Sequence, residues 1–257
     1  MAGGARMEEA KRSDALDFTP MLAQVQANNQ LTGDLLGDAR VVICLGSRAQ
    51  ISFLVGHRGN DGKIIGAATT ESEGLELAER LQPDFLFTSD ELEEGCGLAL
   101  VLKVKRRLQD IRTLLMIRGV PSRPGIQSAI HAGCDGILLE SRMGMGTGLE
   151  AIRTVCGGGI YLDRGLAPAL SLAGGAQGTT ARRAPPNLSP RELDVLARLV
   201  GGESNATIAQ HLIVSVDTVK THLRNVQLKL QARDRTHAAV LALQFGLIDW
   251  PEPAADR

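Results

Sequence analysis

The chain has 257 residues, 44% of them hydrophobic and 3% aromatic, and a formal net charge of −1. This length accommodates one large domain or two smaller ones, each able to bury an aliphatic core. A near-neutral balance indicates neither a nucleic acid nor a membrane as partner, so any charged surface must be local. The chain contains no run of eighteen apolar residues, so no membrane-spanning helix is predicted. The polar N-terminus lacks the apolar segment of a signal peptide, so no signal peptide is predicted.

The four cysteines are scattered and form no CxxC pair, so they predict neither a metal site nor a cofactor. We interpret Cys44, Cys96, Cys134 and Cys156 as buried thiols in a reducing compartment. The sequence therefore predicts a cytoplasmic protein without a cofactor.

Residues 1–38 form a polar N-terminal extension of open purpose, in which a helix from Phe18 to Leu36 is one interpretation. From Arg40 the pattern changes to short apolar runs separated by amphipathic stretches. The runs lie at residues 41–45, 64–68, 85–87, 114–117 and 136–139, and the amphipathic stretches at 72–81, 98–108 and 126–132. Such runs are typical of buried parallel strands, and their alternation with helices indicates βαβ units. Residues 39–171 are thus predicted to form a five-stranded, doubly wound α/β domain.

Residues 172–186, LAGGAQGTTARRAPP, are small and polar and are predicted to be a linker. Residues 187–250 show only helix signals, and 251–257 form a tail. The first helix begins at Ser189-Pro190-Arg191-Glu192, where Ser189 and Glu192 can form a capping box. Ser204 and Ser215 are predicted to cap two further helices.

The third of these helices, from Val216 to about Leu230, carries a core stripe of Val219, Leu223, Val226 and Leu230. Its polar residues are Lys220, Arg224, Gln227 and Gln231, assigned to the opposite face, with Thr221 at the edge. Segment 217–235 carries five basic and two acidic side chains, a local charge of five minus two, or +3. Such a stripe suits base edges and phosphates in a major groove, although an ordinary solvated helix face would look the same by charge alone.

The segment LSPRELDVLARLVGGESNATIAQHLIVSVDTVKTHLRNVQLKL, followed by RDRTHAAVLALQFGLI, resembles the LuxR/FixJ-type helix-turn-helix from end to end. The resemblance implies that Lys220, Thr221 and Arg224 face bases or adjacent phosphates of double-stranded DNA. Its matches also include Asn205, Thr218 and His222, and we add Gln227 from the polar stripe. A last helix, Thr236 to Phe245, is implied to pair two such domains in a homodimer. Ala206 departs from the usual Lys or Arg, which removes one expected phosphate contact.

The α/β domain resembles a response-regulator receiver in its stretches Pro83-Asp84-Phe85-Leu86-Phe87 and Ala132–Leu139. A receiver binds Mg²⁺ through an acidic pair after its first strand and accepts a phosphoryl group on an Asp ending the third. A Thr or Ser after the fourth strand and a Lys after the fifth bind the phosphoryl oxygens. In this chain the four positions carry Gly46-Ser47, Ser89, Arg118 and Glu140, and each has the wrong group.

Asp90 is a possible shifted acceptor, but a one-residue shift in a strand turns the side chain to the opposite face. Arg118 and Glu140 are expected to pair with each other in the degenerate pocket; the alternative is that Arg118 binds an anionic ligand. The acidic run 90–94 is interpreted as a solvated loop.

The sequence therefore predicts a dimeric, sequence-specific transcription regulator whose receiver-like domain does not take phosphate. RNA polymerase or another regulator is a further partner that the resemblance admits. The alternatives are a protein-docking module, a conventional regulator phosphorylated on Asp90, and an enzyme. The last is disfavoured because no phosphate-binding loop, nucleophile elbow or metal cluster occurs.

Overall fold

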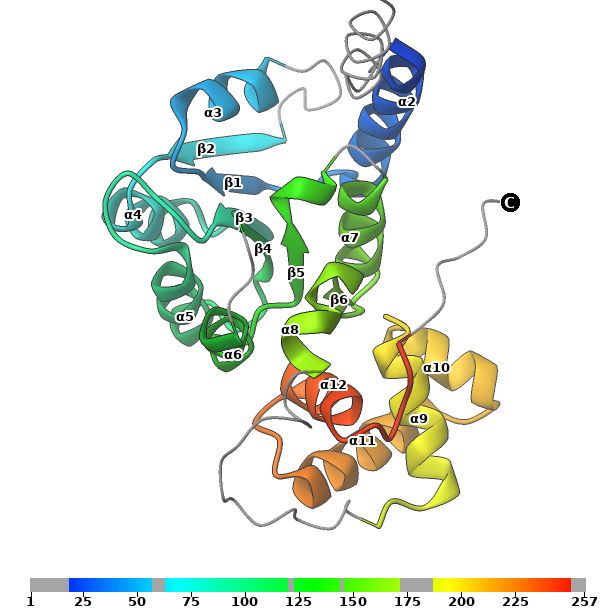
Figure 1. The fold of residues 1–257 in the computed structure, drawn as a ribbon. Coiled ribbons are helices and arrows are strands. Elements are labelled where there is room, and N and C mark those ends of the chain that lie inside the picture. Colours follow the sequence, from blue (N-terminus) through cyan, green and yellow to red (C-terminus); the bar gives the residue numbers. More distant parts are fainter. Residues whose placement is uncertain (1–18, 57–62, 120–122, 144–145, 172–186, 251–257) are drawn as a thin grey trace, which may run out of the picture.

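The computed structural model describes residues 19–56, 63–119, 123–143, 146–171 and 187–250 (Figure 1). A parallel sheet with strand order β2-β1-β3-β4-β5-β6 forms the centre of the first domain. Its strands are β1 (Val41–Cys44), β2 (Ile64–Ala68), β3 (Phe85–Ser89), β4 (Arg112–Ile117), β5 (Gly136–Leu139) and β6 (Tyr161–Leu162). The five predicted strands are confirmed. The sixth was missed because it has only two residues, too few for a recognisable apolar run.

Helices cover both faces of the sheet, as predicted for a doubly wound fold. The helices of this domain are α2 (Thr19–Leu36), α3 (Arg48–Val55), α4 (Glu71–Leu81), α5 (Gly97–Arg107), α6 (Arg123–His131), α7 (Thr147–Cys156) and α8 (Ala167–Ser171). Side chains of α2, α3 and α7 pack with Ile43 and Leu114 on one face. Side chains of α4, α5 and α6 pack with Val42 and Leu115 on the other.

The second domain consists of the helices α9 (Pro190–Val200), α10 (Asn205–Leu212), α11 (Val216–Leu230) and α12 (Arg235–Gln244). The Ser189 hydroxyl accepts a hydrogen bond from the Glu192 amide, and the Glu192 carboxylate accepts one from the Ser189 amide. This is the predicted capping box. Ser204 and Ser215 cap α10 and α11 in the same way, which confirms those predictions. The predicted linker 172–186 and tail 251–257 lie outside the described residues.

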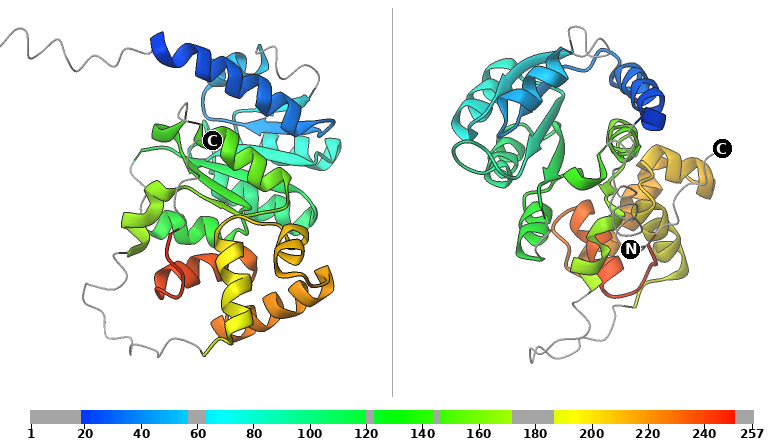
Figure 2. Two further views of the ribbon diagram at one scale, coloured as in Figure 1. Left: turned by 90° about the vertical axis from the view of Figure 1, so that its right-hand side faces the viewer. Right: turned by 45° about the horizontal axis from the view of Figure 1, so that its top comes forward.

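The two domains contact each other mainly through α12 and the segment that follows α7 (Figures 1 and 2). The Thr236 hydroxyl donates a 2.9 Å hydrogen bond to the Cys134 carbonyl oxygen. Val240, 1% exposed, packs with apolar side chains of α6 and α8. In return, Ile160 packs within the core of the helical domain. Val240 and the alanines of α12 are therefore buried within the chain, whereas Leu241 and Leu243 are half-buried.

Two further predictions, on the N-terminal helix and on the cysteines, can be compared with the structure. The helix predicted in the N-terminal extension is present as α2, which packs against α7. Cys44 and Cys134 are buried, but Cys96 and Cys156 are only half-buried, so the prediction of four buried thiols is wrong for two of them. Within the described ranges, no helix is long and apolar enough to cross a bilayer.

Candidate nucleic-acid interface and the pocket at the strand ends

Helix α11 presents an exposed polar surface. Its core stripe is buried as predicted: Val219 and Val226 are 0% exposed and Leu223 and Leu230 are each 6% exposed. Lys220, Thr221 and Arg224 are exposed. The Lys220 ammonium lies 3.3 Å from the Asp217 carboxylate, and Thr221 donates its hydroxyl hydrogen to the Asp217 carbonyl oxygen at 2.9 Å. Both contacts are local and on the surface, so they leave these side chains accessible to a ligand.

The polar residues do not all lie opposite the core. At about 100° per residue, Lys220 lies roughly a quarter-turn from the buried stripe, whereas Thr221 and Leu228 lie at the centre of the exposed face. Gln227 is half-buried, and Leu228 is 69% exposed. The assignment of Lys220 and Gln227 to the opposite face is therefore corrected. Leu228 was missed because only the polar side chains were considered for this face of the helix.

The other residues assigned to DNA are less open. Thr218 and His222 are half-buried. The Thr218 amide donates to the Ser215 hydroxyl, so Thr218 takes part in the cap of α11. Asn205, the first residue of α10, is also half-buried, and its side-chain oxygen has no hydrogen-bond partner. Thr218 and His222 thus border the exposed face of α11 and do not lie at its centre, and Asn205 belongs to a different helix.

Two of the five basic side chains in segment 217–235, those of Lys229 and Arg235, form contacts within the protein. The Lys229 ammonium lies 2.6 Å from the Glu192 carboxylate, which is almost fully buried. Burial raises the pKa of Glu192, but the Lys229 ammonium and the Ser189 donors outweigh it and lower this pKa overall. Arg235 donates to the carbonyl oxygens of Gly158 and Glu203 at the domain contact. The local charge of +3 is therefore only partly available to a ligand.

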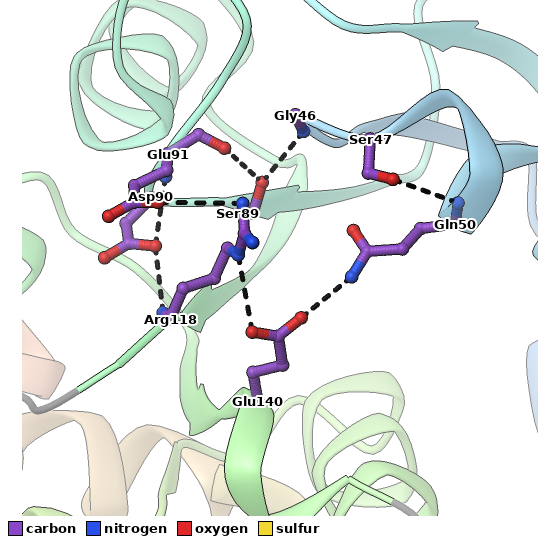
Figure 3. Close-up of polar contacts among 8 residues, drawn as sticks. All are labelled: Gly46, Ser47, Gln50, Ser89, Asp90, Glu91, Arg118 and Glu140. Carbon is purple, nitrogen blue, oxygen red and sulfur yellow. Dashed lines mark hydrogen bonds and ion pairs between the residues drawn. The ribbon is translucent and has the colours of Figure 1, made fainter.

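The four positions of the degenerate pocket converge at the carboxyl edge of the sheet (Figure 3). The Gly46 amide donates to the Ser89 hydroxyl at 3.3 Å, so the ends of β1 and β3 meet. The Arg118 guanidinium donates to Glu140 at 3.3 Å, so the ends of β4 and β5 meet. This ion pair confirms the pairing that the sequence predicted. Ser47 accepts from the Gln50 amide and caps α3.

Gln50 and Glu91 complete the pocket, and sequence reasoning missed both. The Gln50 side-chain amide donates to Glu140 at 2.8 Å, and the Glu91 carboxylate lies 3.6 Å from the Arg118 guanidinium. Gln50 carries no charge pattern that would have revealed it. The Arg118 guanidinium pairs with the carboxylates of Glu91 and Glu140, and the Asp90 carboxylate accepts from the Arg118 backbone amide (Figure 3). This excess of negative charge disfavours the alternative in which Arg118 binds an anion.

The two candidate phosphate acceptors are already engaged. Ser89 is 0% exposed, and its hydroxyl donates to the Glu91 carbonyl oxygen at 2.7 Å. One Asp90 carboxylate oxygen accepts from the amides of Arg118 and Glu91, each at 3.0 Å. Burial raises the pKa of Asp90. Asp90 therefore joins the ends of β3 and β4.

The acidic run is more ordered than a solvated loop. Glu93 accepts from the Thr69 hydroxyl at 2.7 Å and from Arg48 at 3.2 Å. The backbone carbonyl of Glu94 accepts from the Glu71 amide. With the Asp90 contacts, these bonds tie the loop to its neighbours, so the interpretation as a purely solvated loop is wrong.

Comparison with known proteins identifies the helical domain. A model of the GerE family, described as bacterial regulatory proteins of the luxR family, matches residues 186–242. The C-terminal domain belongs to the luxR family. The LuxR-type resemblance of the sequence is thereby confirmed, and the exposed residues of α11 lie within the matched segment.

The similarity to relatives extends over both domains of this protein. The nitrate/nitrite response regulator protein NarL of Escherichia coli strain K12 is 29% identical over 180 residues, 70% of this chain and 82% of NarL. The transcriptional regulatory protein LiaR of Bacillus subtilis strain 168 is 29% identical over 189 residues, 74% of this chain and 88% of LiaR. A structure of the RcsB response regulator of Salmonella typhimurium aligns at 15% identity and a TM-score of 0.46, covering 79% of this chain and 96% of that one.

Proposed function

We propose that this protein is a sequence-specific DNA-binding transcription regulator. One observation carries the proposal: in a luxR-family domain, α11 exposes Lys220, Thr221 and Arg224 beside a fully packed core stripe. A helix with this combination enters a major groove, where Lys and Arg contact phosphates or guanine edges. The names of NarL and LiaR, a response regulator and a transcriptional regulatory protein, support the same class.

We assign residues 39–171 to a receiver-like domain, 172–186 to a linker and 187–250 to the DNA-binding domain. The receiver-like domain works without phosphorylation. The pocket pairs Arg118 with Glu140 where a receiver needs a hydroxyl and a lysine, and its Ser89 is buried. Phosphoryl transfer depends on positioned charges that neutralise the transferred group, and this pocket has an excess of carboxylates instead.

A dimer that pairs through α12 requires this helix to leave its present position. Val240 and Thr236 of α12 are buried against the receiver-like domain. The same surface cannot contact a second chain at the same time. We therefore expect the two domains to separate when the protein binds as a dimer to a two-fold symmetric DNA site.

Genome-wide mapping of the fragments bound by the purified full-length protein tests the proposal. We expect a shared inverted-repeat motif, with affinity that falls steeply as salt rises. Binding without any shared motif contradicts sequence-specific regulation and favours the protein-docking alternative. A screen for enzymatic turnover, which tests the enzyme alternative, is expected to show no activity. Retention of RNA polymerase on the immobilised protein tests RNA polymerase as an additional partner.

A further inference from the structure

An apolar cavity of about 160 Å³ lies in the receiver-like domain, away from the pocket at the strand ends. Val41 and Ile43 of β1 and Phe87 of β3 form part of its floor. Leu54 of α3 and Ile152 of α7 border it on the sides. Leu36, Thr32 and Asn28 of α2 close it from the direction of the N-terminal extension, where Figure 1 shows α2 beside α7.

The cavity follows from how this face of the sheet is covered. Helix α3 has only eight residues and buries none of them fully. Helix α2 packs on α7, and its residues Asn28, Thr32 and Leu36 line the space that remains. Interiors are normally packed without voids larger than a water molecule, so this partly open space beside Ile43, which is 2% exposed, marks incomplete packing of this face of the sheet.

The lining defines the chemistry of an occupant. Its described side chains are aliphatic or aromatic apart from those of Asn28 and Thr32, and none of them is charged. The Thr32 hydroxyl donates to the Asn28 backbone carbonyl oxygen, and the Asn28 side-chain oxygen accepts from the Gln24 side-chain amide at 3.0 Å. The Asn28 side-chain N–H groups are therefore the donors that an occupant could use. An enclosed apolar cavity of about 150 Å³ in another protein binds benzene, and this partly open one has a similar volume.

We propose that this cavity is a binding site for a small uncharged molecule with a single aromatic ring or a short branched alkyl chain. One hydrogen-bonding group on the ligand would reach the side-chain amide of Asn28. The ring or chain occupies the space between Ile43, Phe87 and Ile152. A charged ligand is excluded, because no described lining residue can neutralise it.

The cavity is lined in part by α7, the helix that also approaches the DNA-binding domain. Helix α7 contributes Ile152 to the cavity, and Thr154, two residues later, lies where its methyl group would meet a side chain at Gly202 of the helical domain. A ligand beside α7 is therefore placed to act as an input. This last step rests on the proposed function, whereas binding of the ligand does not.

Methyl NMR of the full-length protein tests binding without DNA. Benzene, phenol and benzoate are titrated while the methyl groups of Ile43, Ile64 and Ile152 are followed. Ile208, in the core of the helical domain, is the internal reference. We expect saturable shifts with benzene and phenol confined to the three cavity residues, about threefold tighter binding of phenol, and no shift with benzoate. Asn28→Leu should remove the preference for phenol.

Filling the cavity provides the matched comparison. Thr32→Leu, or Leu149→Phe if the first variant fails to fold, should weaken benzene binding at least tenfold, by an order-of-magnitude expectation from lost cavity volume. Gln30→Leu adds the same side chain at an exposed position of α2 and should change nothing. Absence of saturable shifts with both benzene and phenol overturns the proposal. So does equal movement of Ile208, or unchanged binding in the filled variants.

Discussion

Glu192 combines two structural roles in one buried carboxylate, and both are testable. It closes the capping box of α9 and neutralises Lys229 of α11. Glu192→Ala should lower the free energy of unfolding by about 1–2 kcal/mol, the usual cost of losing such a cap. Chemical denaturation at neutral pH measures this. Asp194→Ala, which removes an exposed carboxylate two residues further along the same helix, should leave stability nearly unchanged.

The pH dependence of this effect has a definite sign. The pKa of Glu192 is lower in the folded protein than its ordinary value of 4.5. The folded state therefore favours the ionised form, and the stabilisation is present above about pH 4.5 and lost as the pH falls through the folded pKa. Wild-type protein and Glu192→Ala should converge in stability toward acidic pH. A gap that widens on acidification contradicts this assignment.

Lys220 and Arg224 should determine affinity for the operator. Lys220→Ala or Arg224→Ala is expected to cost about 1–3 kcal/mol of binding free energy while leaving the fold intact, since both side chains are exposed. Fluorescence anisotropy with a mapped operator measures the loss. Arg80→Ala removes the same charge from the exposed surface of α4 and should bind normally. Unchanged affinity in folded Lys220→Ala and Arg224→Ala would remove these residues from the interface.

Some single-residue features followed from the sequence and others did not. The caps at Ser189, Ser204 and Ser215 were predictable because a cap depends on residues within one turn. The Arg118–Glu140 pair was predictable because parallel strands bring their carboxyl ends together. Gln50 bonds to a residue 90 positions away through a neutral amide, and no local pattern encodes such a contact.

At the level of strands, the carboxyl ends of β3, β4 and β5 determine whether the domain takes phosphate. Incubation with acetyl phosphate and Mg²⁺, followed by intact mass measurement, should show no added phosphoryl group. The reason is that Asp90 is held by two amides and Ser89 is buried. A hydroxylamine-sensitive adduct on Asp90 would contradict phosphorylation independence. A matched receiver from a phosphorylated relative is the positive control for the reagent.

The elements themselves were largely predictable, because each follows from a local pattern. The predicted strands and helices of both domains are present. The position of α12 was not predictable. Its apolar residues indicate that a surface is covered, but the pattern is the same whether a second chain or the receiver-like domain covers it.

At the scale of the whole molecule, the domains meet so closely that one methyl group should separate them. Gly159 is buried, and a Cβ atom there would overlap the backbone carbonyl oxygen of Gly202 in the other domain. Gly159→Ala should therefore release the helical domain while both domains remain folded. If α12 pairs two chains once free, the variant should dimerise at lower concentration and bind its operator more tightly than the wild type.

Analytical ultracentrifugation and operator titration measure the two consequences. Gly157→Ala is the matched control, since a methyl group there meets only carbonyl oxygens of its own helix at 3.3 Å or more. Dimerisation unchanged in Gly159→Ala, with domain separation shown by scattering, would mean that α12 is not the pairing surface. Unchanged scattering would mean that the domain contact tolerates the added methyl group.

Trp250 gives the protein an intrinsic optical reporter of this separation. It is the single tryptophan of the chain, and it packs half-buried against the apolar cluster that side chains of the receiver-like domain form with Val240 of α12. Indole emission shifts to longer wavelength when water reaches the ring. Excitation of this one residue therefore reports on a single boundary, without a dye or a label. The fraction of open molecules can be followed in real time as DNA, a ligand or a second chain is added.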